Sequence, residues 1–166
     1  RLRPVWPRAG AGSRGAARPA GVAASGVTMR IGFTGTRRGM TDDQKRTFIV
    51  NLLALHAAEF HHGDCVGADD EAATIAHKLI PRPLIHCWPP EYSGYRAFNQ
   101  HADVMHPAHD FHARNRLIVG ATEILLAALP ANGQRREGGT WYTVGYANRQ
   151  KKPVRLIWPD GSMTEE

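Results

Sequence analysis

Four segments of this 166-residue chain carry glycine, hydroxyl, acidic or arginine residues, the types that anion-binding sites use. The first segment contains Gly35, Thr36 and Arg37. Glycine lets the backbone approach a ligand closely, and hydroxyl and guanidinium groups donate hydrogen bonds to phosphate oxygens. The segment matches neither the Walker A loop nor the GxGxxG dinucleotide fingerprint. A tight turn with surface arginines is therefore the alternative interpretation.

The second segment runs from Gly63 to Asp69 and includes Cys65 and Gly67. Backbone amides here could bind an anion, and Asp69 stands where the N-cap of a following helix would lie. Asp69 thus either contacts a ligand, orders this loop, or only caps the helix. Cys65 could be a reactive thiolate at a helix start, but a small packing residue is the simpler interpretation.

The third segment is Gly138-Gly139-Thr140, which follows an apolar strand and precedes a helical pattern. Two glycines and a hydroxyl at a helix N-terminus form a phosphate cradle, because the first backbone amides have no partner inside the helix. A glycine-rich turn that binds nothing is the alternative.

The fourth segment, Arg114-Asn115-Arg116, falls in the first turns of an expected helix. An arginine that points into a cleft without a partner is costly, so such arginines usually meet a carboxylate or a phosphate. The alternative is three solvated side chains.

A polar loop from Glu91 to about His109 adds aromatic and basic side chains, namely Tyr92, Tyr95, Arg96 and Phe98. These residues could form a lid that stacks on a base or a ribose, with ordinary surface packing as the alternative.

Metal-ligating residues show no diagnostic spacing. Among nine histidines, His109 and His112 could share a helix face and hold a metal, but no HExxH or carboxylate-rich pattern accompanies them. Cys65 and Cys87 stand far apart and in no zinc-binding spacing. We therefore expect no metal site and no resident cofactor.

Strands and helices that alternate along the chain must position these segments. Thr41 and Gln44 predict a capping box for a helix over 42–57. Further helices are expected over 69–80, 109–121 and 140–150, and strands over 30–36, 58–63, 83–88, 123–129 and 153–158. This order predicts an α/β fold, an open Rossmann-like three-layer sandwich with a mainly parallel sheet of about five strands.

In open α/β sheets, ligands bind beyond the carboxyl ends of the strands, near the point where the strand order reverses. We therefore expect Arg37, Asp69, Arg114 and Thr140 to gather at one edge of the sheet and to face the same anion. The sequence predicts a pocket there for a phosphorylated, nucleotide-like small molecule.

The formal charge of +6 is concentrated in residues 1–28, which hold five arginines and no acid. We interpret that segment as a disordered tail or as non-native upstream sequence, with a transit peptide or basic arm as the alternative, and residues 29–166 as a single domain. No apolar run approaches the roughly 20 residues of a membrane helix. A cytoplasmic protein is the expectation from this pattern and from the few cysteines.

Four matches in chain order resemble the SLOG superfamily, the Rossmann-like group that includes the DNA-processing protein A (DprA) family and the LOG phosphoribohydrolases. They are GFTGTR, GDCVGADDEAATIAH, FHARNRLIVGATEILLAAL and GGTWYTVGYANRQKKPV, which together span about residues 30–158. The GTWxT pattern is most similar to the short bacterial or phage members, the YspA-like or YpsA-like group. The resemblance implies a phosphate-binding loop and, by analogy with LOG-like and DprA-like proteins, a homodimer.

The resemblance also implies three functions. The first is nucleotide binding by a sensor or sequestering domain. Its phosphate would be held by Gly35, Thr36, Arg37, Gly138, Gly139 and Thr140. Arg114 would neutralise the phosphate charge, and Asp69 would meet the ribose or order its loop. The further candidate ligand-binding residues are Gly63, Gly67, Arg96, Asn115 and Thr143. The second is hydrolysis of a nucleoside monophosphate at its N-glycosidic bond, with Asp69, Glu137 and Arg114 as candidate catalytic residues. Against this activity, Thr143 occupies the place of the LOG glutamate and Asn115 that of its lysine. The third is single-stranded DNA binding, which the near-neutral charge of residues 29–166 disfavours.

Overall fold

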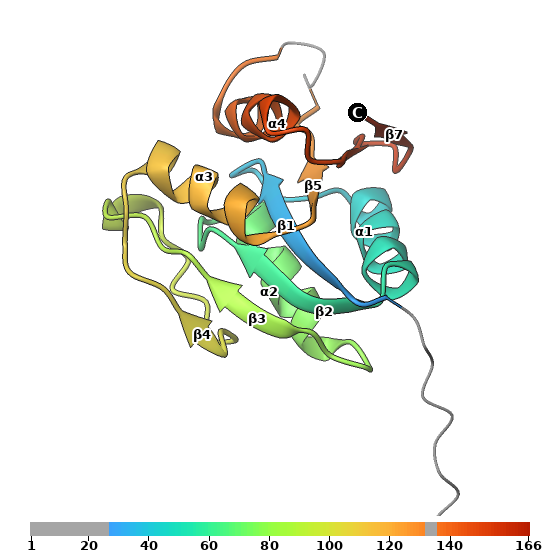
Figure 1. The fold of residues 1–166 in the computed structure, drawn as a ribbon, viewed down its shortest axis with the longest axis horizontal. Helices are drawn as coiled ribbons and strands as arrows, with labels where there is room; N and C mark the ends of the chain where they lie inside the picture. The colour runs from blue at the N-terminus through green and yellow to red at the C-terminus, as the bar shows by residue number, and fades with distance from the viewer. Residues whose placement is uncertain (1–26, 132–135) are drawn as a thin grey trace, which may run out of the picture.

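The computed structural model describes residues 27–131 and 136–166, and Figure 1 shows how their elements are arranged. Residues 1–26, on which most of the expectation of a disordered tail rests, lie outside the described residues. The strands are β1 (Met29–Gly35), β2 (Ala57–His62), β3 (Leu84–Cys87), β4 (Val104–Met105), β5 (Ile124–Ala128), β6 (Val154–Ile157) and β7 (Met163–Glu165). The helices are α1 (Asp42–Ala54), α2 (Ala68–Lys78), the 3₁₀ turn η1 (Ser93–Tyr95), α3 (Phe111–Ala121) and α4 (Gly139–Arg149).

The strands form one sheet in the order β4-β3-β2-β1-β5-β6-β7. All neighbouring strands are parallel except β6 and β7, which are antiparallel. The strand order reverses between β1 and β5, which places the switch point at their carboxyl ends. The predicted open, mainly parallel α/β sandwich is therefore confirmed. The sheet gains two short strands, β4 and β7, beyond the five that apolar runs predicted.

Helices cover the sheet on both faces, with α1 and α2 on one side and α3 and α4 on the other (Figure 1). β5 shows why its apolar run is continuous. Leu126 and Ala128 pack into the cluster on the α1–α2 side, while Leu125 and Ala127 pack into the cluster on the α3–α4 side. Alternate residues of a strand point to opposite faces, so a strand covered on both faces must be apolar throughout.

The first helix begins at the predicted capping box. The Thr41 hydroxyl accepts a hydrogen bond from the Gln44 backbone amide, and the Gln44 side chain accepts one from the Thr41 amide. Gln44 is buried, and its Nε2 also donates to the carbonyl oxygens of Leu129 (2.8 Å) and Ile157 (2.9 Å). This side chain therefore ties α1 to the ends of β5 and β6. The helix ends at Ala54, short of the predicted residue 57, because His56 adopts a left-handed turn conformation before β2.

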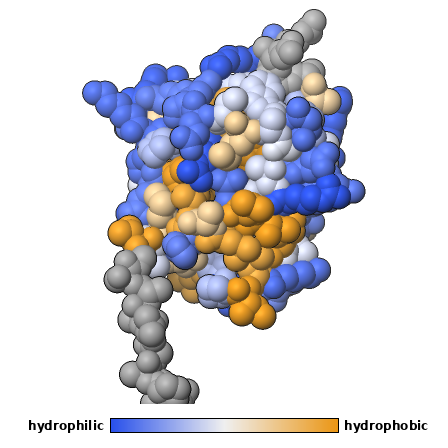
Figure 2. Space-filling view, turned by 90° about the vertical axis from the view of Figure 1, so that its right-hand side faces the viewer, coloured by the Kyte–Doolittle hydropathy of each residue, from blue (hydrophilic) through white to orange (hydrophobic). Residues whose placement is uncertain are grey.

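Apolar side chains also lie on the surface. Figure 2 shows them gathered in the lower part of one face, below a mainly hydrophilic region. Exposed apolar residues of the described chain include Leu53 and Ile80, near a hollow that Leu52, Leu79 and Pro81 help to line. None of the described helices combines the length and the hydrophobicity that a membrane crossing needs.

Candidate functional site

A cavity of about 510 Å³ lies at the carboxyl ends of β1 and β5, at the switch point of the sheet. All four segments singled out in the sequence contribute to its wall. The lining residues are Thr34, Gly35, Thr36, Arg37, Arg38, Cys65, Phe111, His112, Arg114, Asn115, Pro130, Glu137, Gly138, Gly139 and Thr140. Its volume falls within the usual range for small-molecule sites.

The loop after β1 is shaped by close contact with the loop before α2. The Thr36 carbonyl accepts hydrogen bonds from the amides of Gly39 and Ala68, at 3.1 and 3.0 Å. Gly35 packs so tightly on α2 that a Cβ would lie 2.5 Å from the Cβ of Ala68. The exposed Arg37 guanidinium stacks over the Tyr95 ring at 3.7 Å from its centroid. Contacts with α2 and with the 3₁₀ turn η1 therefore hold this loop in place.

The start of α4 opens into the cavity without a cap. Gly138 is the N-cap residue, and no side chain accepts a hydrogen bond from the first turn. A Cβ at Gly138 or Gly139 would meet no atom of the described residues within 4 Å. The first backbone amides of this 11-residue helix have no hydrogen-bond partner within the helix. The positive end of the helix dipole therefore lies at the cavity wall.

Arg114 lies in the first turn of α3, as the sequence predicted, and lines the same cavity. It is 4% exposed, and its guanidinium donates to the carbonyl oxygens of Gly63 and Trp88 and to the side chain of Asn115. Among the described residues Arg114 forms no ion pair with a carboxylate within 4 Å. The direct hydrogen-bond partners of the Arg114 guanidinium are therefore neutral groups. With Arg37 and Arg38 it gives the described cavity lining three guanidinium groups and one carboxylate, Glu137.

Asp69 lies behind the cavity wall rather than in it. The N-cap of α2 is Gly67, so the interpretation of Asp69 as a helix cap is wrong. Its carboxylate instead accepts hydrogen bonds from the backbone amides of Gly63 (3.0 Å) and Cys65 (3.3 Å), in the loop before the helix. This is the loop-ordering role that was one of its predicted alternatives. Burial raises the pKa of Asp69 to about 6, against the opposing effect of the nearby Arg114 charge.

Cys65 lines the cavity, but its environment opposes a thiolate. Burial and the Asp69 carboxylate raise the pKa of the Cys65 thiol above its ordinary value. The packing interpretation of this cysteine therefore fits the structure better than the nucleophilic one.

Four more candidate ligand-binding residues also lie outside the lining set, namely Gly63, Gly67, Arg96 and Thr143. The two glycines allow close packing, since a Cβ at Gly63 would overlap the Arg114 side chain and one at Gly67 would overlap the Arg37 backbone. The buried Thr143 hydroxyl donates to the Gly139 carbonyl at 2.9 Å, inside its own helix. These three residues support the wall of the cavity from behind.

Arg96 serves the long loop instead of the cavity. Its Nε lies 2.8 Å from Oδ2 of Asp64, a carboxylate that is fully buried. The other oxygen of Asp64 accepts from the Asn99 amide at 3.0 Å, and the Asp64 carbonyl accepts from Ala97. Asp64 therefore organises residues 96–99 and was not singled out in the sequence, because an acid beside glycine is typical of an ordinary turn.

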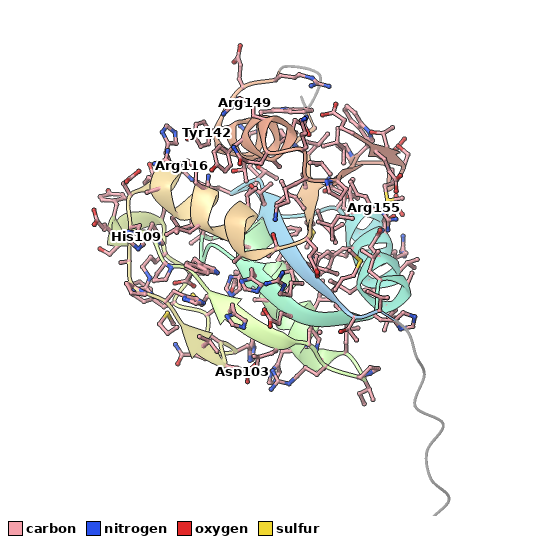
Figure 3. The ribbon with its side chains drawn as sticks, in the orientation of Figure 1. Asp103, His109, Arg116, Tyr142, Arg149 and Arg155 are labelled. Carbon is pink, nitrogen blue, oxygen red and sulfur yellow. The ribbon has the colours of Figure 1, made fainter. Side chains whose placement is uncertain are left out.

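Side-chain contacts beside the cavity join α3 to α4. The Arg116 guanidinium donates to the Tyr142 hydroxyl at 2.9 Å, and Figure 3 shows the two side chains side by side. His112 stacks on the same Tyr142 ring at 4.0 Å. Phe111 lies between Arg37 and Arg114, with their guanidinium carbons 5.7 and 5.8 Å from its ring centroid. Phe111 was not singled out in the sequence, because one aromatic residue at a helix start is common.

Fold and cavity together define an open Rossmann-like α/β protein with an arginine-lined cavity at its switch point. No family model matches the chain, and no curated protein matches it. Among solved structures, the fold is similar to that of the molybdenum cofactor binding protein from the phototrophic bacterium Rippkaea orientalis. The match has a TM-score of 0.61 and 22% sequence identity, over 80% of this chain and 77% of that chain. This likeness shows the shared fold.

Proposed function

We propose that this chain binds a phosphorylated, nucleotide-like small molecule in the switch-point cavity, as a sensor or sequestering domain. One observation carries the proposal: the uncapped start of α4 and the buried Arg114 guanidinium line the same cavity. The described lining residues include three arginines, Arg37, Arg38 and Arg114, and one carboxylate, Glu137. A phosphate would accept hydrogen bonds from the helix amides and offset the excess positive charge.

We assign the chain to the SLOG superfamily within this proposal, on the four sequence matches given above. Gly35, Gly138, Gly139 and Arg114 belong to the matched motifs and line the cavity, which supports the assignment. The solved neighbour binds a molybdenum cofactor, so that cofactor belongs with nucleotides in the panel of candidate ligands.

Isothermal titration calorimetry tests the proposal with the full chain and a panel of nucleoside monophosphates, diphosphates, cyclic nucleotides and inorganic phosphate. Arg37→Gln removes an exposed cavity arginine, and we expect it to weaken binding roughly tenfold, as for the loss of a charge-assisted hydrogen bond. Arg46→Gln is the matched control, because Arg46 is an exposed arginine that pairs with Asp43 on α1 and lies outside the lining set. Absence of binding by every member of the panel, or equal binding by Arg37→Gln and wild type, would contradict the proposal.

Glycosidic hydrolysis is a second candidate function, and Glu137 is the observation that favours it. Among the described residues, Glu137 is the carboxylate that lines the cavity, and it is exposed to solvent there. Asp69 is separated from the cavity by the loop that it orders. If the chain is a hydrolase, Glu137→Gln should abolish release of the free base from a nucleoside monophosphate, as followed by chromatography. Binding without base release by the wild type supports the sensor function alone.

The remaining expectations stand as parts of the proposal. We propose that residues 29–166 form one domain and that the chain pairs as a homodimer, which sedimentation equilibrium tests. DNA binding is disfavoured because residues 29–166 carry 16 basic and 15 acidic side chains. Salt-sensitive binding of single strands by that segment would reverse this preference.

A further inference from the structure

Three histidines from neighbouring strands meet on one face of the sheet, away from the switch-point cavity. His61 of β2 is the direct register partner of His86 in β3. His86 in turn pairs with Val104 of β4, and His106 follows Val104 by two residues. Side chains of register partners, and of residues two apart, point to the same face of a sheet. The topology therefore stacks the three imidazoles side by side.

No helix of the described chain lies in front of β3 and β4 in Figure 1. The rings of His61 and His86 stack with centroids 4.2 Å apart. The Trp88 ring lies over His106 at 3.5 Å, and its Nε1 donates to Nδ1 of His61 at 3.1 Å. Trp88 thus forms one wall of the cluster and shields it from water.

The nitrogen atoms of the cluster lie at separations that suit one bound ion. One ring nitrogen from each histidine lies within 4.8 Å of the others. Nδ1 of His86 is 3.0 Å from Nε2 of His106, close to the roughly 3.3 Å between ligands of a tetrahedral ion with bonds of about 2.0 Å. Oε2 of Glu59 lies 2.9 Å from Nε2 of His61 and 3.7 Å from Nε2 of His86. A carboxylate therefore stands at the edge of the same cluster.

One atom of the cluster is left without a partner. Nε2 of His86 is buried and makes no hydrogen bond in the structure. An orphaned buried nitrogen is uncommon in proteins and calls for an ion, a water or a rearranged neighbour. His61 is also almost fully buried, at 2% exposure. Two buried or half-buried imidazoles beside a carboxylate provide unprotonated nitrogen and anionic oxygen, the donors that borderline transition metals prefer.

We propose that His61, His86 and His106, with Glu59 as a fourth oxygen ligand, bind a divalent transition metal of the Zn²⁺ class. Metal binding requires the stacked rings to turn until one nitrogen of each points toward a common point. His86 would offer either Nδ1, beside His106, or its unpartnered Nε2, beside Glu59. The chemistry favours Zn²⁺ over Mg²⁺ or Ca²⁺, because three of the four donors are nitrogen. This site differs from His109 and His112, the pair weighed in the sequence, and departs from the expectation of no metal. It was invisible to sequence spacing because three separate strands supply the ligands.

Calorimetric titration of the full chain with ZnCl₂ tests this proposal, with tag-free protein that has been dialysed against EDTA and then against phosphate-free buffer. We expect one Zn²⁺ per chain. His106→Gln and His86→Gln should each weaken binding by roughly tenfold or more, because each removes a metal ligand. His101→Gln is the matched control, since His101 stacks on His77 at the same 4.2 Å without a third histidine in the group. Its Zn²⁺ affinity should equal that of the wild type.

Co²⁺ binding supplies a readout that needs no variant. A tetrahedral site gives intense visible absorption, whereas Co²⁺ held by scattered surface histidines stays octahedral and pale. No heat of binding with Zn²⁺, octahedral Co²⁺ spectra, or equal affinity of wild type and both cluster variants would each overturn the proposal. None of these outcomes depends on whether the switch-point cavity binds a phosphate.

Discussion

Gly67 lies directly against the backbone of Arg37, so that a Cβ at position 67 would stand 2.3 Å from the Arg37 carbonyl oxygen. Gly67 also has φ of +87°, a conformation that other residues adopt only with strain. The loop after β1 and the loop before α2 are therefore fitted to each other. The shape of the loop after β1 therefore depends on a glycine that does not itself line the cavity.

Substitution of Gly67 by alanine should destabilise the fold by about 2 kcal/mol or more, because strain in φ adds to overlap with the Arg37 backbone. Urea unfolding followed by circular dichroism measures the change. Gly120→Ala is the control, since a Cβ at Gly120 meets nothing within 4 Å and the residue lies in α3. We expect Gly120→Ala to be neutral or stabilising. Equal stability of the two variants would show that the loops are not locked in this way.

Gly139→Ala should raise stability and lower ligand affinity. A Cβ at Gly139 meets nothing within 4 Å, and alanine is a better helix former than glycine by up to about 1 kcal/mol. The fold therefore has no need of glycine there, whereas a phosphate that approaches the backbone does. Thermal unfolding and calorimetry on the same samples separate the two effects.

Gly145→Ala is the control for that prediction, because Gly145 lies in the same helix and outside the cavity lining. Its Cβ would make only an ordinary contact of 3.5 Å with the Arg149 side chain. We expect a similar gain in stability with unchanged affinity. An unchanged affinity in Gly139→Ala itself would show that the α4 backbone does not contact the ligand.

The raised pKa of Asp69 predicts that the stability of the fold falls as the pH rises. Burial raises the pKa of this carboxyl from 3.8 to about 6, so between these values the folded chain holds a proton that the unfolded chain has lost. The associated stabilisation is fully present below about pH 4 and is lost as pH rises through 6. The stability difference between wild type and Asp69→Asn should therefore shift against the wild type by up to about 3 kcal/mol from pH 4 to 7. Urea titrations at intervals of pH measure it, and a difference independent of pH would refute the assignment.

Arg96→Ala should lower stability far more than ligand affinity. The substitution leaves the fully buried Asp64 carboxylate without its cationic partner, which we expect to cost about 3 kcal/mol. Arg46→Ala is the matched control, because the Arg46–Asp43 pair is solvent-exposed on α1 and should contribute less than about 0.5 kcal/mol. Affinity that falls more than stability would instead place Arg96 at the ligand, as the sequence interpretation had it.

The fold followed from local patterns that parallel α/β proteins share. The continuous apolar run predicted the buried strand β5, and the capping box predicted the start of α1. Both predictions are confirmed. β4 and β7 escaped prediction because strands of two and three residues leave no periodicity to read. Pairing with β3 and β6 defines them, and pairing is a property of the whole sheet.

The sequence predicted which segments line the cavity, but it did not predict the role of each residue in them. Glycine and arginine types placed Gly35, Arg114 and Gly139 around one cavity, because strand ends of a parallel sheet share an edge. The sequence does not show that Asp69 turns away from the cavity toward two backbone amides. Such hydrogen bonds depend on loop conformations that one sequence does not specify. The histidine cluster required the register of three strands and could not be seen earlier.

The sheet ends in very short edges, the two residues of β4 on one side and the three of β7 on the other. Edge strands of this length leave few unpaired backbone groups for another chain to join. A homodimer of this protein would accordingly associate through side-chain packing rather than by continuing the sheet from one subunit into the next. The same brevity protects the folded chain against growth into cross-β fibrils, in which long free edges act as templates.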